Sequence, residues 1–208
     1  MARTRSENYD DIQNGILAAA AGLFAKQGYG RTSITDLADA CGQSRGALYH
    51  YFDSKEAILF AILDAHVRRM IADVDAATAR ENDMPKRFHA AISAIVLLNA
   101  KSSSEQRLIL HDLAFLGEDD QQRIKSLERK LVETVAGLLE KLDKHGKIVK
   151  SNRKVYTMLL FGMLNYSHTW YQPTRGIPPA EFADMIVNQF LGGLLSPKPA
   201  VSGSARAR

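Results

Sequence analysis

This 208-residue chain contains one cysteine, six prolines and no long hydrophobic run. The single thiol, Cys41, cannot form an internal disulfide, which excludes a disulfide-stabilised secreted scaffold and a cysteine-rich zinc module. No apolar stretch reaches the roughly 18 residues that a membrane-spanning helix needs. The N-terminal residues MARTRSENYD lack the apolar segment of a secretory signal. We therefore expect a cytoplasmic protein with no membrane partner.

The chain also has only a small excess of charge of one sign. Lysine and arginine number 27 against 23 aspartate and glutamate residues, which leaves a formal net charge of +4. Residues 1–55 are balanced, residues 56–196 carry one excess positive charge, and residues 197–208 contribute the other three. Such a total is weak evidence for a nucleic-acid partner, so that function has to be inferred from local geometry.

Helical periodicity dominates the chain. Apolar residues recur every three or four positions, and neither an alternating strand pattern nor an internal repeat is visible, which predicts an all-α protein of about nine helices. After a first helix that ends near Gly28, Ser33 and Asp36 form a variant of the capping box at the start of a second. Ser44 and Ser54 are expected to cap a short third helix and a longer fourth one.

Five further helices are expected after a polar break near residues 80–85. They cover residues 87–100, 106–116, 121–145 (stopped by Gly146), 155–171 and 180–195, and the GEDD sequence at 117–120 is expected to form a loop. The segment 155–171 is apolar on nearly all sides, which predicts that most of its surface is buried. Small and polar residues dominate positions 197–208, so we expect a disordered tail there.

Residues 33–52 have the spacing of a helix-turn-helix unit, with its turn at residues 41–43. A DNA major groove about 12 Å wide admits one helix, and that helix needs an apolar inner side and a small, polar outer side. Leu48 and Phe52 supply the inner side, and Arg45 can form a bidentate contact with guanine. The predicted DNA-binding residues are Ser33, Thr35, Gln43, Ser44, Arg45, Gly46, Ala47, Tyr49, His50, Tyr51 and Lys55, of which the last begins a helix whose positive end favours a phosphate.

The run FAKQGYGRTSITDLADACGQSRGALYHYFDSKEAIL, residues 24–59, resembles the N-terminal domain of the TetR/AcrR family of bacterial transcriptional regulators. The matching features are the G-Y-x-x-T-S element from Gly28 and the block from Gly42 to Glu56, which shows no departure from the family pattern. The resemblance implies a homodimer, usually a repressor released from palindromic operator DNA by a small molecule. It implies a DNA-binding domain at 10–55 and a ligand-binding and dimerisation domain at 56–196. Residues 1–9 are expected to be a flexible basic arm.

A second stretch, FGMLNYSHTWYQPTRGIPPAEFADMIVNQFLGGL at residues 161–194, is similar to a subgroup of that family. Several members of the subgroup regulate fatty-acid, sterol or aromatic catabolism and respond to acyl-CoA thioesters. The resemblance therefore implies a hydrophobic effector of this class. A thioester also needs cations at the pocket mouth, for which Lys101, Arg107, Arg153 and Lys154 are the candidates by location.

Candidate effector contacts are polar or aromatic side chains within the apolar helices of the larger domain. Asn165 and His168 need partners when buried, and the ligand, another helix or a second subunit can supply them. His66 and His111 can line a cavity, but they lack the supporting spacing of a metal site, so neither a metal nor another cofactor is predicted. The candidate ligand-binding residues are His66, Met70, His111, Phe115, Asn165, Tyr166, His168 and Trp170. Of these, Tyr166 and Trp170 are of a kind found more often in a core or an interface than in a pocket wall.

Two alternatives remain open from the residues alone. The chain can instead be an all-α enzyme or small-molecule-binding protein with an incidental helix-turn-helix. Against an enzyme, the chain contains no G-x-S-x-G, H-E-x-x-H, phosphate-loop or dinucleotide motif, and the acidic pair Asp119 and Asp120 lies in a polar setting.

The second alternative concerns the N-terminus. Arg3 and Arg5 fit either an arm that enters the minor groove or a disordered terminus.

Overall fold

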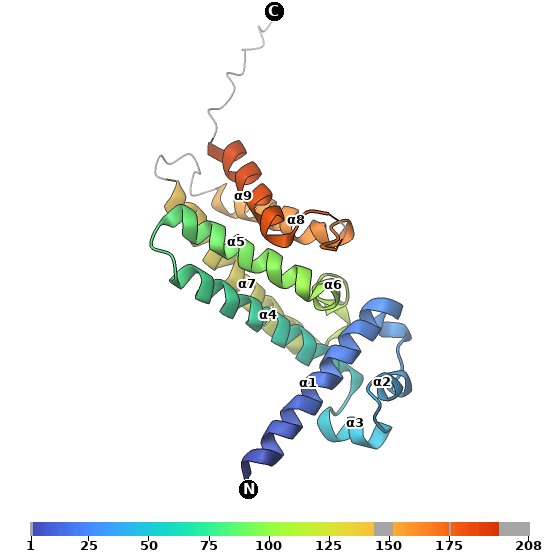
Figure 1. The fold of residues 1–208 in the computed structure, drawn as a ribbon. Coiled ribbons are helices and arrows are strands. Elements are labelled where there is room, and N and C mark those ends of the chain that lie inside the picture. The colour runs from blue at the N-terminus through green and yellow to red at the C-terminus, as the bar shows by residue number, and fades with distance from the viewer. Residues whose placement is uncertain (1, 144–151, 175, 196–208) are drawn as a thin grey trace, which may run out of the picture.

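The structure, a computed structural model, describes residues 2–143, 152–174 and 176–195. Every regular element in these ranges is a helix, which confirms the predicted all-α class (Figure 1). The α-helices are α1 (Ala2–Gln27), α2 (Ile34–Ala40), α3 (Arg45–Tyr51), α4 (Lys55–Ala79), α5 (Met84–Lys101), α6 (Ser103–His111), α7 (Glu118–Leu142), α8 (Arg153–Tyr166) and α9 (Pro179–Leu195). The predicted tail at 197–208 and the predicted helix stop at Gly146 lie outside the described residues.

Helices α1 to α3 gather at one end of the molecule, and α4 leads from them into the bundle of α4 to α9 (Figure 1). The predicted capping box is present, because the Ser33 hydroxyl accepts a hydrogen bond from the Asp36 amide at 3.1 Å and the Asp36 carboxylate accepts one from the Ser33 amide at 2.8 Å. These bonds hold the pKa of Asp36 below its ordinary value. Gly42 ends the α2 segment with φ +63°, a left-handed conformation that glycine adopts without a steric penalty.

The N-terminal segment differs from the prediction. Helix α1 begins at Ala2, so residues 2–9, expected to be a flexible arm, are its first turns, and the backbone of Arg3 and Arg5 is helical. No glycine or proline interrupts the chain between Ala2 and Asn14, which permits the helix. The apolar periodicity begins only at Ile12, and for that reason the sequence pattern does not reveal the extra turns.

Helix α4 connects the two parts of the molecule. Its predicted inward stripe is confirmed, since Ile58, Ile62, His66 and Met70 are all buried. It packs against α1 at its beginning and against α5, α6 and α7 along its length. Within the described ranges, no helix has the length and apolarity to cross a bilayer.

Two boundaries around residue 117 also differ from the prediction. The expected helix 106–116 is split, because α6 ends at His111 and a 3₁₀ turn, Leu113–Phe115, follows. The expected loop at 117–120 instead begins α7, whose first turn holds Glu118, Asp119 and Asp120. Carboxylates at that position are stabilised by the positive end of the helix dipole, so this acidic run favours a helix start.

Helix α8 is the clearest departure from the predicted burial. It ends at Tyr166, and Val155, Leu159, Met163 and Tyr166 are between 37 and 68% exposed in the single chain. Their spacing of four, four and three residues places them on one face of the helix, the α8 stripe. The prediction that this segment is buried on most sides is therefore wrong for one copy of the chain. A monomer rarely leaves such an apolar patch uncovered.

Candidate nucleic-acid interface and internal cavities

Helix α3 is held with one side inward and the other toward solvent. The Ser44 hydroxyl accepts a hydrogen bond from the Ala47 amide at 3.1 Å and caps the helix. Leu48 is 1% exposed and Phe52 is buried just beyond the last turn, as the sequence predicts. The Gln43 amide donates to the Ala38 carbonyl at 2.9 Å, which fixes the turn between α2 and α3.

The outward surface of α3 has small and hydrogen-bonding side chains. Arg45, Gly46, Tyr49 and His50 are exposed, and Tyr49 is 51% exposed. Across the described part of the chain, the Arg45 guanidinium has no hydrogen-bond or ion-pair partner, so its five donors are free to face a base edge or a phosphate. None of the predicted DNA-binding residues is buried, although Thr35, Gln43, Ala47, Tyr51 and Lys55 are only partly exposed.

An aromatic contact joins α3 to the extended N-terminus of α1. The Tyr9 ring lies 4.6 Å from the Tyr51 ring and 6.2 Å from the His50 ring, measured between centroids. Tyr9 therefore positions the end of α3 that carries two predicted DNA-binding residues. The sequence pattern did not identify Tyr9, since it was assigned to a flexible arm.

Lys55 makes contacts within the protein that the sequence pattern does not predict. Its Nζ atom donates to the carbonyl oxygens of Tyr29 at 3.0 Å and Thr32 at 2.8 Å, and lies 4.3 Å from the centroid of the Tyr29 ring. Two of its three donors are thus used to fasten α4 to the turn before α2. Ser33 is likewise engaged as the cap of α2, and its own hydroxyl proton remains for a phosphate.

A second contact joins the α6–α7 connection to the N-terminal domain. The Phe115 ring packs on the Tyr29 ring, with centroids 4.9 Å apart, and the Gly117 amide donates to Glu56 Oε1 at 2.5 Å. Phe115, predicted to contact the effector, therefore lies at the boundary between the domains. Tyr29 connects both contacts, because its carbonyl also accepts from Lys55.

A cavity of about 520 Å³ lies among α4, α5, α6, α7 and α8, and we call it the central cavity. The predicted residues His66, Met70 and Asn165 line it, together with apolar side chains such as Ile95 and Phe161. A mixed apolar lining with a few converging polar groups is typical of a small-molecule site.

Three polar side chains form a chain of hydrogen bonds at the inner end of this cavity. His66 Nε2 donates to Gln106 Oε1 at 3.2 Å, and Gln106 Nε2 donates to Asn165 Oδ1 at 3.4 Å. Burial lowers the pKa of His66, which keeps the imidazole neutral at pH 7. Gln106 is 4% exposed and was not identified from the sequence, because it lies next to a polar break.

Charged side chains from α7 and α8 line the outer side of the central cavity. Lys125, Arg129 and Lys154 contribute three cations, and all three are exposed. Glu128 lies among them, and burial raises the pKa of its carboxyl group above the ordinary value. Of the four cations proposed from the sequence for a thioester, Lys154 alone lines this cavity.

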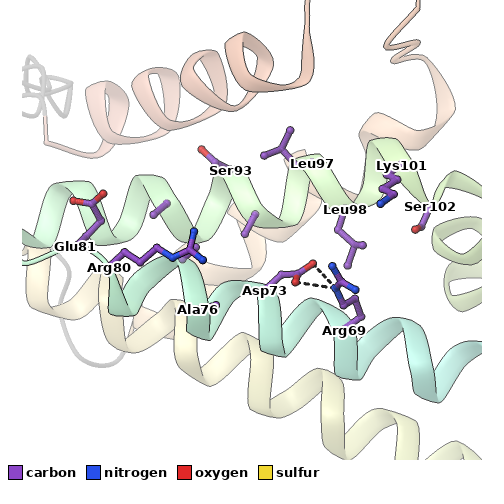
Figure 2. Close-up of a pocket in the computed structure, with 13 residues that line it drawn as sticks. Arg69, Asp73, Ala76, Arg80, Glu81, Ser93, Leu97, Leu98, Lys101 and Ser102 are labelled. Atoms are coloured by element: carbon purple, nitrogen blue, oxygen red, sulfur yellow. Dashed lines mark hydrogen bonds and ion pairs between the residues drawn. The ribbon is translucent and has the colours of Figure 1, made fainter.

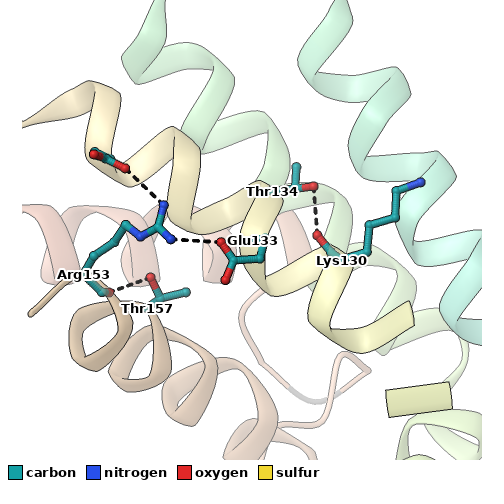
Figure 3. Close-up of polar contacts among 6 residues, drawn as sticks. Lys130, Glu133, Thr134, Arg153 and Thr157 are labelled. Carbon is teal, nitrogen blue, oxygen red and sulfur yellow. Dashed lines mark hydrogen bonds and ion pairs between the residues drawn. The ribbon is translucent and has the colours of Figure 1, made fainter. Parts of the chain in front are cut away.

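The other carboxylate at this mouth, Glu133, is neutralised within the protein. Arg153 reaches from the start of α8 to α7 and contacts Glu133 at 3.0 Å and Glu140 at 3.1 Å (Figure 3). Arg153 therefore serves as an ion-pair partner here, which differs from its candidate role toward a ligand. Its pairing leaves the positive charge of Lys125, Arg129 and Lys154 dominant at the mouth.

The remaining predicted effector residues lie elsewhere. His111 and His168 face each other outside the central cavity, with their Nε2 atoms 3.1 Å apart, and His168 also bonds the Asn165 carbonyl through Nδ1. Tyr166 and Trp170 are 68% and 58% exposed on the surface next to α8. In the described ranges, no three His, Cys, Asp or Glu side chains gather as metal ligands would.

Lys101 lines a different hollow, an open groove of about 680 Å³ between α4 and α5. Figure 2 shows Arg69 and Asp73 paired across one turn of α4 inside this groove, with Leu97 and Ser93 projecting from α5. The groove is lined by small and charged side chains and is open to solvent, so it is less suited to an apolar ligand than the central cavity. Arg107 borders a third hollow, beside His111.

Comparison with known families matches both parts of the chain. Residues 16–62 match the model of bacterial regulatory proteins of the tetR family, and residues 81–194 match that of the tetracyclin repressor-like C-terminal domain. The transcriptional repressor KstR2 of Rhodococcus jostii is 26% identical over 187 residues, which cover 88% of this chain and 90% of KstR2. The match to the activator FasR of Mycolicibacterium smegmatis is 30% identical but spans only 50% of this chain and 47% of FasR.

Solved structures agree with this result over nearly the whole chain. A TetR-family transcriptional regulator from Bordetella parapertussis has a TM-score of 0.83 and 34% identity, covering 91% of this chain and 98% of that one. The structure of AibR in complex with isovaleryl coenzyme A and operator DNA has a TM-score of 0.76 and 26% identity, covering 86% of this chain and 97% of that one.

Proposed function

The chain belongs to the TetR family of bacterial regulatory proteins, and we propose that it is a homodimeric repressor that an acyl-CoA thioester releases from a palindromic operator. The observation that carries the DNA-binding part is the geometry of α3. Its inner side is anchored by the buried Leu48, and its outer side presents the exposed Arg45 beside the small Gly46. A helix with these two sides fits the major groove, where an arginine reads guanine.

A second copy of the chain is the proposed occupant of the α8 stripe. Two copies of this apolar face, related by a two-fold axis, would cover each other and leave no exposed patch. Gly162 lies on an exposed part of the same helix with no atom near its Cβ position, which allows close helix approach. A dimer then places two α3 helices in successive major grooves about 34–36 Å apart.

The central cavity is the proposed effector site. Its apolar interior suits an acyl group, and Lys125, Arg129 and Lys154 at its mouth suit the phosphates of coenzyme A. AibR, which is similar to this chain in fold, was solved with isovaleryl coenzyme A, and this supports the thioester class. Catabolism of fatty acids, sterols or aromatic compounds would supply such a ligand.

Release from DNA follows from the elements that the cavity shares with the domain boundary. Helices α4, α6 and α7 line the cavity, and the same helices lead to Lys55, Phe115 and Gly117 at the N-terminal domain. A ligand that binds one arrangement of these helices more tightly shifts the dimer toward that arrangement. The changed separation of the two α3 helices no longer matches successive grooves.

The test is binding of the purified protein to the intergenic DNA upstream of its own gene. We expect saturable binding at an inverted repeat, with an affinity that falls steeply as salt rises, and dissociation when octanoyl-CoA is added. Arg45→Ala is the matched variant, because it changes an exposed side chain without disturbing the core. Equal, weak binding to unrelated DNA would contradict a sequence-specific regulator, and binding that no thioester reverses would contradict the effector class.

A further inference from the structure

The central cavity shares one lining residue with a second cavity. The second cavity, which we call the side cavity, has a volume of about 310 Å³ and lies among α5, α6 and the α8–α9 connection. Among the described residues, Gln106 is the only one that lines both cavities. Gln106 therefore borders both the larger and the smaller cavity, and we call its side chain the wall.

The side cavity has a more polar lining than the central one. Asn99, Ser103, Ser167 and His168 contribute hydrogen-bonding groups to it. The Asn99 Oδ1 atom is fully buried and has no hydrogen-bond partner among the residues that the structure describes. An unpaired buried amide oxygen is costly, so a ligand donor that reaches this atom through rotation of the Asn99 side chain is favoured.

Gln106 is oriented by its neighbours on the central side. Its oxygen accepts from His66 at 3.2 Å and its nitrogen donates to Asn165 at 3.4 Å, so rotation of the amide breaks both bonds. The neutral state of His66 leaves it one N–H to donate, and that proton is used on Gln106. Displacing the Gln106 side chain thus breaks two hydrogen bonds, and only a ligand that forms replacement hydrogen bonds offsets this cost.

We propose that Gln106 determines effector specificity, and that the preferred effector is an acyl thioester whose far end carries a hydroxyl group that displaces Gln106 and bonds Asn99 in the side cavity. This inference rests on the proposed effector site. A hydroxyl is the fitting group because it can donate to an amide oxygen and can also accept from an amide nitrogen. An unsubstituted alkyl end forms no hydrogen bond in the side cavity, so it leaves the Asn99 oxygen unpaired.

The experiment compares matched ligands on the full-length protein by titration calorimetry. The pair is octanoyl-CoA and 8-hydroxyoctanoyl-CoA, and the corresponding free acids form a second pair. We expect the hydroxylated member to bind about threefold to tenfold more tightly, because its hydroxyl replaces the bonds that Gln106 loses and one of the new bonds pairs the otherwise unpaired Asn99 oxygen. Asn99→Ala should abolish that preference, and Asn99→Ser should retain part of it. Asn188→Ala, on an exposed position of α9, is the control and should leave the preference unchanged.

Gln106→Ala tests the wall itself. Removing the amide joins the two cavities, so each methylene that enters the side cavity should tighten binding by about fourfold. Dodecanoyl-CoA should therefore gain on octanoyl-CoA in this variant compared with the wild type. An unchanged ratio would show that Gln106 does not limit the length of the acyl group.

The outcomes separate this inference from the proposed function. Equal binding of the two thioesters to the wild type, with operator release intact, overturns the inference and leaves the proposed function standing. A hydroxyl preference seen only with the free acids, without thioester binding, supports the role of Gln106 and Asn99 and contradicts the acyl-CoA class. Binding of neither pair overturns the inference.

Discussion

Leu159 lies in the middle of the α8 stripe, and its replacement tests whether that stripe forms the dimer interface. Its side chain is 58% exposed in the single chain. Full burial of a leucine contributes about 1.5–3 kcal/mol, so covering the exposed part contributes about 1–2 kcal/mol per copy. A two-fold interface contains the residue twice. Leu159→Ala should therefore weaken the dimer by up to about 2–4 kcal/mol, or roughly 30- to 800-fold in dissociation constant.

Sedimentation velocity over a range of protein concentrations measures this change directly. Leu159→Asp should dissociate the dimer further, because a carboxylate would have to be buried against the partner. Leu97→Ala is the matched control, since Leu97 is 48% exposed in the groove between α4 and α5 and lies outside the α8 stripe. An unchanged dimer in both Leu159 variants, or a wild-type chain that sediments as a monomer, would refute the assignment of this surface.

Three further predictions concern the domain boundary and the cavity mouth. Lys55→Met should lower the thermal midpoint by about 3–9 °C, because the buried Thr32 carbonyl loses its donor at a cost of about 1–3 kcal/mol. An unchanged midpoint would contradict a stabilising role of this contact. Phe115→Ala should leave operator affinity without effector intact and weaken the response to thioester. The factor by which thioester raises the operator dissociation constant should fall by about 2- to 12-fold, because the variant loses an aromatic pair with Tyr29 that contributes about 0.5–1.5 kcal/mol. Glu128→Gln should raise the thermal midpoint at pH 7 and have no effect below about pH 4.5, because burial raises the pKa of Glu128 in the folded protein and the wild type loses stability as the pH rises from about 4.5 through that raised pKa. Equal pH profiles of the two proteins would contradict burial of the charge.

The DNA-binding domain could be predicted closely because its signals are local. Ser33, Ser44 and Ser54 each accept a hydrogen bond from the amide three residues later, as their positions before apolar runs predict. The left-handed φ of Gly42 is a property of that residue alone. The inner side of α3 follows from the spacing of Leu48 and Phe52.

The features that sequence reasoning missed depend on residues far apart in the chain. Lys55 is held by carbonyls 23 and 26 positions earlier, and this contact has no signature in a local pattern. Gln106 acquires its role through bonds to His66 and Asn165, which are 40 and 59 positions away. Leu159 is exposed in the single chain and is covered only in the proposed dimer, so periodicity identified an apolar segment without showing what covers it.

Selection of binding sites from random-sequence DNA, with the wild type and Arg45→Ala in parallel, tests sequence reading by α3 most directly. The wild type should enrich an inverted repeat whose half-site centres are about 10–10.5 base pairs, or a multiple of that, apart. Arg45→Ala should keep the spacing and lose the preference for one guanine in each half-site, a discrimination of about 1–3 kcal/mol. Enrichment of no sequence by the wild type, or an identical preference in the variant, would contradict recognition of DNA by this helix face.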